Sequence, residues 1–264
     1  MISVLVTGSN GQLGMSLRDL ELAYSQIQFE FKTSSELDIT DKLNIKQVFS
    51  QQNYDYCINC AAYTNVEQAE KEPDLAFKVN AEGVKNLAQA CLTNNTVLIH
   101  ISTDYVFDGE DSEPYKIDDV TNPINAYGRS KLQGEINVRE LLSKYFIVRT
   151  SWLYSDYGNN FYKFILGKAS RGEEMLITDS QTGCPTNAKN LANFVIRLIV
   201  TQNQQYGIHH FTDGEVLTWY TFALKILKEN NLLGQAKIQK VKNYRTFAKR
   251  PRYSVLKNTI IQAK

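Results

Sequence analysis

The chain has 264 residues, of which 43% are hydrophobic and 22% charged, with 29 basic residues against 28 acidic ones. A chain of this length can bury a core without disulfides or metal, and its balanced charge excludes the basic field typical of nucleic-acid binders. No apolar run approaches the roughly eighteen residues of a membrane span, and the N-terminal MISVLVTGSNG lacks the basic start of a signal peptide, so we expect a cytoplasmic protein with no nucleic-acid or membrane partner.

The first 150 residues alternate between short apolar runs typical of strands and longer stretches typical of helices. Strands that alternate with helices form a parallel sheet covered on both faces, and right-handed crossovers wind it doubly, so the pattern predicts an α/β fold of Rossmann type. The expected strands are 2–7, 28–32, 56–59, 97–102 and 146–150, and the expected helices are 13–24, 45–52, a long helix from Pro73 to 93, and 126–144.

After Thr150 the alternation becomes looser. Helices are expected over 160–170, 190–201 and 217–230, and strands over 207–212 and 237–241. We find no internal repeat or linker. We therefore expect a main domain made of residues 1–150 with about 187–212, and a small C-terminal lobe made of about 151–186 with 213–264.

The cysteines and histidines do not predict a metal site. Cys57 and Cys60 have the C-x-x-C spacing of some redox and zinc sites. They lie in the apolar run YDYCINCAAY, without a second cysteine pair or a nearby histidine, which favours buried structural cysteines. The histidines His100, His209 and His210 lie in runs typical of strands, and we interpret them as core residues.

A glycine-rich loop follows the first expected strand. Gly8, Gly11 and Gly14 form G-x-x-G-x-x-G between that strand and the first helix. Glycine allows a tight turn and lets backbone N–H groups approach a pyrophosphate, and the helix N-terminus adds the positive end of its dipole. An ordinary strand-to-helix turn can share this spacing, but its position is the one that dinucleotide binding requires. The sequence therefore predicts NADPH or NADH as cofactor.

The end of the second expected strand bears on the choice between these cofactors. NAD-specific sites place an acidic residue there to hold the adenosine ribose. Lys32 and Thr33 stand there instead, which favours the 2′-phosphate of NADPH, although Lys32 also fits a solvated loop charge. Asp38 in SELDITD is placed to hydrogen-bond adenine or to serve as a helix cap or loop acid.

Tyr127 and Lys131 in AYGRSK are four residues apart in an expected helix, so they share a face. An ammonium beside a phenol lowers the tyrosine pKa from its usual value of about 10, which suits a general acid or base. The fourth strand ends in Ser102 and Thr103, and hydroxyls at that end of a parallel strand face the ligand crevice. We predict catalysis by Thr103, Tyr127 and Lys131, against the alternative of a surface tyrosine–lysine pair.

Longer stretches carry a family resemblance. The loop VTGSNGQLG has the T-G-x-x-G-x-x-G spacing of extended short-chain dehydrogenases/reductases. Within that group the chain resembles the dTDP-4-dehydrorhamnose reductase family through LDITD, NCAAYTNVEQAE, STDYVFDG, NAYGRSKLQGE, VRTSWLY, GCPT and RPRYSVL, over nearly its whole length. The resemblance implies NAD(P)H-dependent reduction of the 4-keto group of dTDP-4-dehydro-L-rhamnose to dTDP-L-rhamnose, for cell-surface polysaccharide. The main domain would then bind the cofactor, and the lobe the sugar nucleotide.

The resemblance also implies roles for individual residues. Tyr127 would donate a proton to the developing alkoxide, Thr103 would orient the carbonyl, and Lys131 would contact the nicotinamide ribose. With Lys32, the residues expected at the cofactor are Gly8, Asn10, Gly11, Gln12, Leu13, Gly14, Asp38, Ile39, Ala61, Ala62, Tyr63, Tyr127 and Lys131. The residues expected at the sugar are Thr103, Asp104, Tyr105, Tyr127 and Trp152.

Trp152 has some support of its own. It follows the fifth strand at the mouth of the crevice, where an aromatic face can stack on a sugar ring. The alternative is a core tryptophan at the junction with the lobe.

Two features depart from the family pattern. Some members bind magnesium at a dimer interface through glutamates, one of which directly follows the third glycine. Met15 stands at that position here, and a thioether is a poor ligand for a hard cation. We therefore expect no magnesium site of that kind, and a homodimer stays open. Members also usually continue through a further C-terminal helix, whereas this sequence ends at Lys264, soon after RPRYSVLKNTII.

Two other functions stay open on the sequence alone. An epimerase or dehydratase acting on sugar nucleotides would share Tyr127 and Lys131, but it usually needs further acids or bases beside the threonine, where this chain has Asp104 and Tyr105. A non-catalytic, NADP-binding regulatory subunit, similar to the beta subunit of methionine adenosyltransferase, is the second alternative. The intact Thr103, Tyr127 and Lys131 favour an enzyme.

Overall fold

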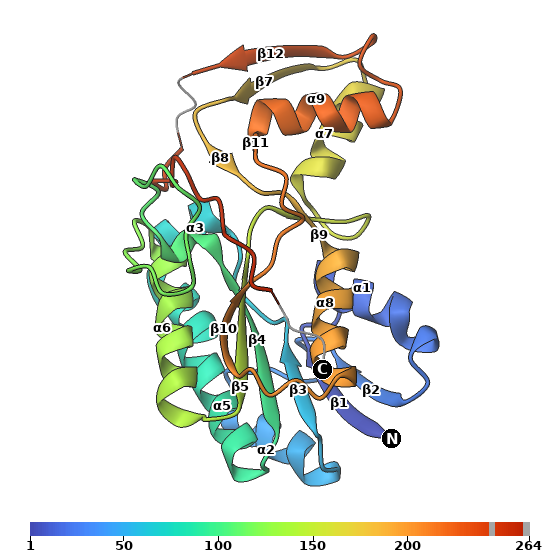
Figure 1. Ribbon diagram of the computed structural model, residues 1–264, viewed down its shortest axis with the longest axis vertical. Helices are drawn as coiled ribbons and strands as arrows, with labels where there is room; N and C mark the ends of the chain where they lie inside the picture. The colour runs from blue at the N-terminus through green and yellow to red at the C-terminus, as the bar shows by residue number, and fades with distance from the viewer. Residues whose placement is uncertain (243–245, 261–264) are drawn as a thin grey trace.

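A parallel sheet forms the centre of the main domain (Figure 1). Residues 1–242 and 246–260 are described by the computed structural model, and within them the sheet has six strands in the order β10-β5-β4-β3-β1-β2. All neighbouring strands pair in parallel, so their carboxyl ends share one edge, and the chain crosses from β2 on one side of β1 to β3 on the other. Ligands of such sheets bind at that crossing point. The strands are β1 (Ile2–Thr7), β2 (Ile27–Lys32), β3 (Tyr56–Asn59), β4 (Val97–Thr103), β5 (Tyr145–Thr150) and β10 (Gly207–His210).

Helices cover both faces of this sheet (Figure 1). A hydrophobic core lies on each face of the sheet, because successive side chains of a strand point to opposite faces. Val4 and Val6 of β1 pack towards α1 and α8, and Leu5 between them packs towards α2 and α5. The bounds of these helices are α1 (Gln12–Leu20), α2 (Lys42–Gln51), α5 (Val84–Thr93), α6 (Ala126–Leu141) and α8 (Ala188–Val200). The α/β fold predicted from the alternation is confirmed.

The long helix expected from Pro73 to 93 is interrupted. Its parts are α4 (Pro73–Phe77), a π-helical segment (Lys78–Gly83) and α5, and a further short helix, α3 (Val66–Lys71), precedes them. In the π segment the Asn80 side chain accepts from the Tyr63 backbone N–H at 2.8 Å and donates to the Tyr63 carbonyl at 2.9 Å. The wider turn thus holds the loop after β3, and π segments are frequent beside functional sites.

Other element ends shift by a few residues from the expected positions. Helix α2 begins at Lys42 because Asp41 caps it, its carboxylate accepting from two backbone N–H groups of the first turn. Helix α1 ends at Leu20 in a 3₁₀ turn (Glu21–Ala23), α6 ends at Leu141, and β10 ends at His210. These shifts do not alter the order of the elements.

The lobe lies beyond the carboxyl edge of the sheet, at the top of Figure 1. Its helices α7 (Phe161–Ser170) and α9 (Trp219–Glu229) enclose an aromatic and aliphatic core. Strand β7 (Glu174–Thr178), which the sequence did not predict, pairs in parallel with β12 (Lys237–Val241). The short strands β8 (Thr182–Gly183) and β11 (Leu217–Thr218) form an antiparallel pair, and β6 (Leu153–Tyr154) pairs with β9 (Thr186–Asn187).

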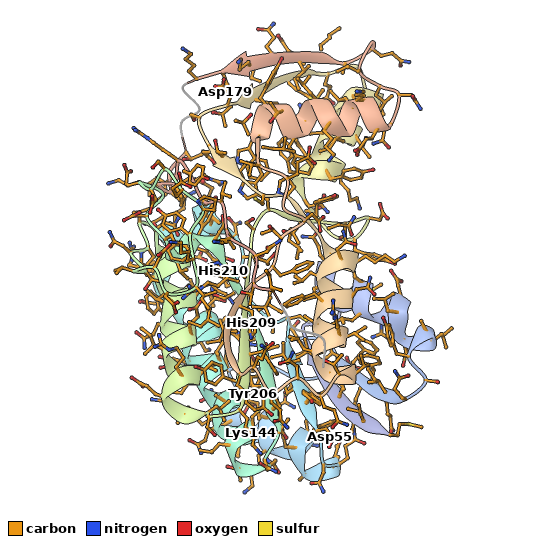
Figure 2. All side chains as sticks on the ribbon, in the orientation of Figure 1. Asp55, Lys144, Asp179, Tyr206, His209 and His210 are labelled. Carbon is orange, nitrogen blue, oxygen red and sulfur yellow. The ribbon has the colours of Figure 1, made fainter. Side chains whose placement is uncertain are left out.

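The described part of the C-terminal tail leaves the lobe and returns along the main domain. Leu256 bridges to Tyr115, and the Thr259 N–H donates to the His210 carbonyl at 2.9 Å, beside β10 (His210 is labelled in Figure 2). Burial of Leu256 against Val106 and Phe107 holds the segment there. The expectation that all of 213–264 belongs to the lobe is therefore wrong for this segment, and residues 243–245 and 261–264 lie outside the described residues. Among the described residues no helix is long and apolar enough to cross a membrane.

Candidate active site

A cleft of about 600 Å³ lies where the carboxyl ends of β1, β3, β4 and β5 meet the lobe. Its floor comes from the loops that follow these strands, and its far wall comes from α6 and the lobe. Ten of the residues predicted at the site line it: Gly11, Gln12, Leu13, Ala62, Thr103, Asp104, Tyr105, Tyr127, Lys131 and Trp152.

The glycine loop is built for close backbone approach. Gly8 has φ +62°, and a Cβ there would lie 2.6 Å from the Ala61 nitrogen, while a Cβ on Gly14 would lie 2.5 Å from Ser9 Cα. No side chain caps the N-terminus of α1, which leaves its first N–H groups for an anion. The Ser9 hydroxyl is buried and lacks a partner within the described residues. This geometry fits a pyrophosphate.

The other residues predicted at the cofactor lie around the loop without lining the cleft. Asn10, one of these, is exposed. Gln12 does line the cleft, but its amide oxygen is already engaged, since it accepts from Ser155 Oγ at 3.0 Å and from Asn160 Nδ2 at 2.9 Å. Gln12 therefore ties the loop to the segment that leads into the lobe. Ala61 packs against Gly8, and Tyr63 is held by the π segment as described above.

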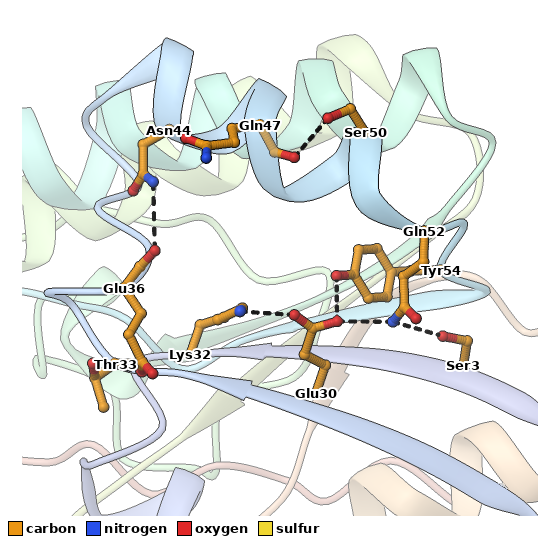
Figure 3. A network of polar contacts seen from close by, with 10 residues as sticks. All are labelled: Ser3, Glu30, Lys32, Thr33, Glu36, Asn44, Gln47, Ser50, Gln52 and Tyr54. Atoms are coloured by element: carbon orange, nitrogen blue, oxygen red, sulfur yellow. Dashed lines mark hydrogen bonds and ion pairs between the residues drawn. The ribbon is translucent and has the colours of Figure 1, made fainter.

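Charged residues gather at the carboxyl end of β2 (Figure 3). Lys32 pairs with Glu30 at 2.8 Å, so it is not a free loop charge. Glu36 accepts from both the backbone N–H and the hydroxyl of Thr33, at 2.8 and 2.7 Å, and these bonds lower the pKa of Glu36. The charges of Lys32 and Arg18 lower it further. Glu36, three residues after Thr33, therefore places a carboxylate beside the end of β2.

The side chains of Asp38 and Ile39 both contact other parts of the protein. The Asp38 carboxylate accepts from the Thr40 N–H at 2.8 Å within the turn that precedes α2. Ile39 is buried in the core between α2 and α5, where Gly83 packs against it. The side chain of Ile39 is thus committed to the core, and its backbone carbonyl accepts from Asn86 Nδ2 at 3.4 Å.

The start of α6 is fixed against the turn that follows β4. Asn125 caps the helix by accepting from the Gly128 N–H at 2.7 Å. A Cβ on Gly128 would lie 2.1 Å from the Tyr105 carbonyl oxygen, so only glycine lets the two segments approach this closely. The rings of Tyr105 and Tyr127 then meet edge to face, with centroids 5.9 Å apart.

Thr103, Asp104 and Tyr127 form one polar group in the cleft. Thr103 donates to Asp104 Oδ1 at 3.0 Å and accepts from the Tyr105 N–H at 3.2 Å. Burial raises the pKa of Asp104 to about 7, although the hydroxyls of Thr103 and Ser254 oppose the shift. Burial also raises the pKa of Tyr127, a contact with Thr103 lowers it, and the charges of Asp104 and Tyr105 raise it further. The raised pKa keeps the phenol protonated, which suits the predicted proton donor, whereas the sequence predicted that Lys131 lowers this pKa.

Lys131 is buried one turn further along α6. Its ammonium donates to the Ile101 carbonyl at 2.6 Å and lies 3.4 Å from His100 Nε2. Burial lowers the pKa of Lys131 to about 8, partly opposed by Glu135 and Cys60.

A buried ion pair that the sequence did not predict lies beneath these groups. Glu135 accepts from Arg149 at 2.7 Å and from the Ser102 hydroxyl at 2.5 Å, and both charged side chains are almost fully buried. The pair joins α6 to β4 and β5. A charged residue inside an otherwise apolar strand, as in YFIVRT, is the one feature of the sequence that could have indicated it.

Trp152, on the wall of the cleft nearest the lobe, packs differently from the prediction that its ring is free to stack on a sugar. Its ring stacks on Trp219 with centroids 3.6 Å apart, and a Cβ on Gly183 would lie 2.7 Å from its Cε2 atom. One face of the Trp152 ring is thus occupied by Trp219, while the residue still lines the cleft. The sequence also missed Arg250, which lines the cleft, pairs with Glu67 at 2.8 Å and carries a buried Nε without a partner in the described chain.

No group of three or more histidine, cysteine or acidic side chains within residues 1–242 and 246–260 is arranged to hold a metal ion. The four cysteines are free thiols. Burial raises the pKa of Cys57 and Cys60, which keeps both protonated.

Comparison with known proteins identifies relatives over nearly the whole chain. Residues 2–264 match the family described as the RmlD substrate binding domain. A dTDP-4-dehydrorhamnose reductase of Aggregatibacter actinomycetemcomitans is 39% identical over 99% of this chain and 92% of its own, and the Bacillus subtilis spore coat polysaccharide biosynthesis protein SpsK is 36% identical over 99% and 91%. The crystal structure of a Bacillus anthracis dTDP-4-dehydrorhamnose reductase in complex with NADP superposes with a TM-score of 0.93, at 39% identity over 98% of this chain and 92% of that one.

Proposed function

The chain belongs to the RmlD substrate binding domain family, and from that membership and the cleft we propose that it reduces dTDP-4-dehydro-L-rhamnose to dTDP-L-rhamnose with NADPH or NADH. The observation that carries the proposal is the meeting of the glycine loop with Thr103, Tyr127 and Lys131 in one cleft. The relation to a spore coat polysaccharide protein supports a role in supplying sugar for surface polysaccharide.

The chain's own residues supply the proton and the orientation. The bound nicotinamide supplies hydride to C4 of the sugar. Tyr127, held protonated by burial, donates its proton to the oxygen that becomes the alcohol. Thr103 lies beside the Tyr127 hydroxyl, where it would orient the substrate carbonyl, and its own hydroxyl is oriented by Asp104. Lys131 brings the positive charge of its ammonium to the edge of the cleft, where a ribose hydroxyl would meet it.

The lobe would take the nucleotide part of the substrate. A pocket of about 380 Å³ adjoins the cleft, with Phe161, Leu176 and Trp219 among its apolar walls. Arg250 lines both spaces, and its unpartnered Nε suits a diphosphate oxygen. We propose that residues 151–186 and 213–242 form the substrate lobe.

The test is turnover of purified protein with dTDP-4-dehydro-L-rhamnose, followed by loss of nicotinamide absorbance at 340 nm. Tyr157→Phe is the matched control for Tyr127→Phe, because Tyr157 bonds to Asp19 outside the catalytic group. We expect turnover in the unmodified protein and in Tyr157→Phe, and its loss in Tyr127→Phe. Folded protein without net cofactor oxidation would reject the reductase, since an epimerase or dehydratase restores its cofactor.

Cofactor choice is tested separately. Lys32→Ala is expected to raise the KM for NADPH by about tenfold, the effect of losing one charged hydrogen bond. The KM for NADH serves as the internal control, because NADH has no 2′-phosphate to meet the lysine. Equal changes for the two cofactors would show that Lys32 does not contact the phosphate.

A further inference from the structure

A row of buried polar side chains crosses three neighbouring strands at one level of the sheet. Thr7 of β1 is the register partner of Asn59 in β3, and Asn59 is the register partner of His100 in β4. Thr7 donates to Asn59 Oδ1 at 2.7 Å, and Asn59 Nδ2 lies 3.1 Å from His100 Nδ1. His100 Nε2 then faces the Lys131 ammonium at 3.4 Å. The row therefore connects the strand of the glycine loop to Lys131.

The hydrogen bonds in this row fix the orientation of the Asn59 amide. The backbone N–H of Ala61 donates to Asn59 Oδ1 at 3.2 Å, and a backbone N–H can only donate. The Thr7 hydroxyl shares the same acceptor. The oxygen of the amide is thus turned away from His100, and its NH₂ group faces the imidazole.

The amide orientation determines the tautomer of His100. Asn59 Nδ2 can only donate, so His100 Nδ1 must accept and carries no proton. His100 is fully buried, and burial together with the Lys131 charge holds its pKa well below the usual range, so the ring is neutral. Its one proton is therefore on Nε2, the nitrogen that faces Lys131.

Two N–H groups consequently face each other across 3.4 Å, which is unfavourable while Lys131 is an ammonium. We propose that His100 is a positioning residue for Lys131: with its proton fixed on Nε2 by Asn59, it directs the ammonium to the Ile101 carbonyl and sets the pH above which Lys131 loses its charge. The other titratable groups that act on the ammonium are Glu135, from α6, and Cys60, from the loop after β3, and both raise the pKa of Lys131. The inference deepens the proposed reductase function and rests on it for its kinetic readout.

The variant that tests this inference is Asn59→Asp. The carboxylate still accepts from Thr7 and Ala61, but it requires a proton on His100 Nδ1 and so turns the lone pair of Nε2 towards Lys131. We expect the alkaline limb of the kcat/KM profile to move up by about one pH unit, as for a cation that gains an acceptor nearby.

The charge that this variant adds needs its own control. Asn59→Asp combined with His100→Leu keeps the carboxylate and removes the imidazole, so the shift should disappear in the double variant. Asn137→Asp adds a carboxylate at another largely buried site on α6 and should leave the limb in place. A shift that persists without His100 would overturn the proposal, because charge alone would then explain it.

A second measurement does not depend on turnover. Two-bond ¹H–¹⁵N correlation spectra of the histidine rings report which nitrogen carries the proton. We expect His100 to be protonated on Nε2 in the unmodified protein and on Nδ1 in Asn59→Asp; a proton on Nδ1 in the unmodified protein would overturn the inference. If the unmodified protein shows no reductase turnover, the proposed function fails. The spectra still decide whether Asn59 fixes the proton of His100 on Nε2, and the pH dependence of the NADPH Kd still reports the charge of Lys131.

Discussion

The contact between Gly128 and the Tyr105 carbonyl predicts a large catalytic effect from one added methyl group. In Gly128→Ala the new Cβ would lie 2.1 Å from that oxygen, whereas ordinary contact begins at 3.4 Å. The start of α6 must therefore withdraw by about 1 Å, and it carries Tyr127 away from Thr103. A displacement of about 1 Å in a catalytic group costs roughly 100-fold in rate, so we expect kcat/KM to fall by about that factor.

The assay for Gly128→Ala compares kcat/KM and the NADPH Kd with those of Gly167→Ala. Gly167 also lies in a helix, but a Cβ there meets only the flexible end of Arg171, at 3.2 Å. Gly167→Ala should keep full activity and gain up to about 1 kcal/mol of stability from helix propensity. The NADPH Kd of Gly128→Ala should change little, because the glycine loop is not displaced. A folded Gly128→Ala protein with kcat/KM within threefold of the unmodified value would refute the reasoning.

Three further outcomes follow from the buried groups. Tyr127→Phe should lower kcat by about 10²–10⁴-fold while the NADPH Kd, measured by fluorescence titration, stays unchanged; an equal loss of affinity would mean that the hydroxyl binds rather than donates. Glu135→Ala leaves Arg149 buried without its partner and should lower the free energy of unfolding by about 3–5 kcal/mol in urea titrations, against less than about 1 kcal/mol for the exposed Glu173→Ala. The pKa of Asp104 is raised to about 7 in the folded state, so the native protein holds an extra proton between about pH 4 and pH 7 and should lose stability as the pH rises through that range. Asp104→Asn should flatten this slope in thermal unfolding, and an unchanged slope would place the titration on another group.

The features that the sequence predicts well depend on local pattern. The apolar runs of β1, β3 and β4 are nearly continuous, as expected for strands buried on both faces, and the spacing of Tyr127 and Lys131 fixes their common helix face. The glycine loop is likewise local, because its turn and the start of α1 are determined within seven residues. These elements carry most of the predicted cleft.

The features that the sequence did not predict depend on contacts between residues far apart in the chain. Strand β7 forms because β12, some sixty residues later, pairs with it, and the five residues EMLIT do not indicate this by themselves. Trp152 could be placed near the cleft from its position, but its stacking on Trp219 belongs to the packing of the lobe. The raised pKa of Tyr127 depends in the same way on burial, which the spacing of Tyr127 and Lys131 does not reveal.

The return of the tail along the main domain has a consequence for how the protein is made. The first five strands of the sheet leave the ribosome in one uninterrupted stretch, so this part can assemble while synthesis continues. Strand β10, the β7–β12 pair and the bridge between Leu256 and Tyr115 all need residues that emerge later. The wall that closes the cleft is therefore the last part to form, and a nascent chain acquires its cofactor loop well before it can enclose a sugar nucleotide.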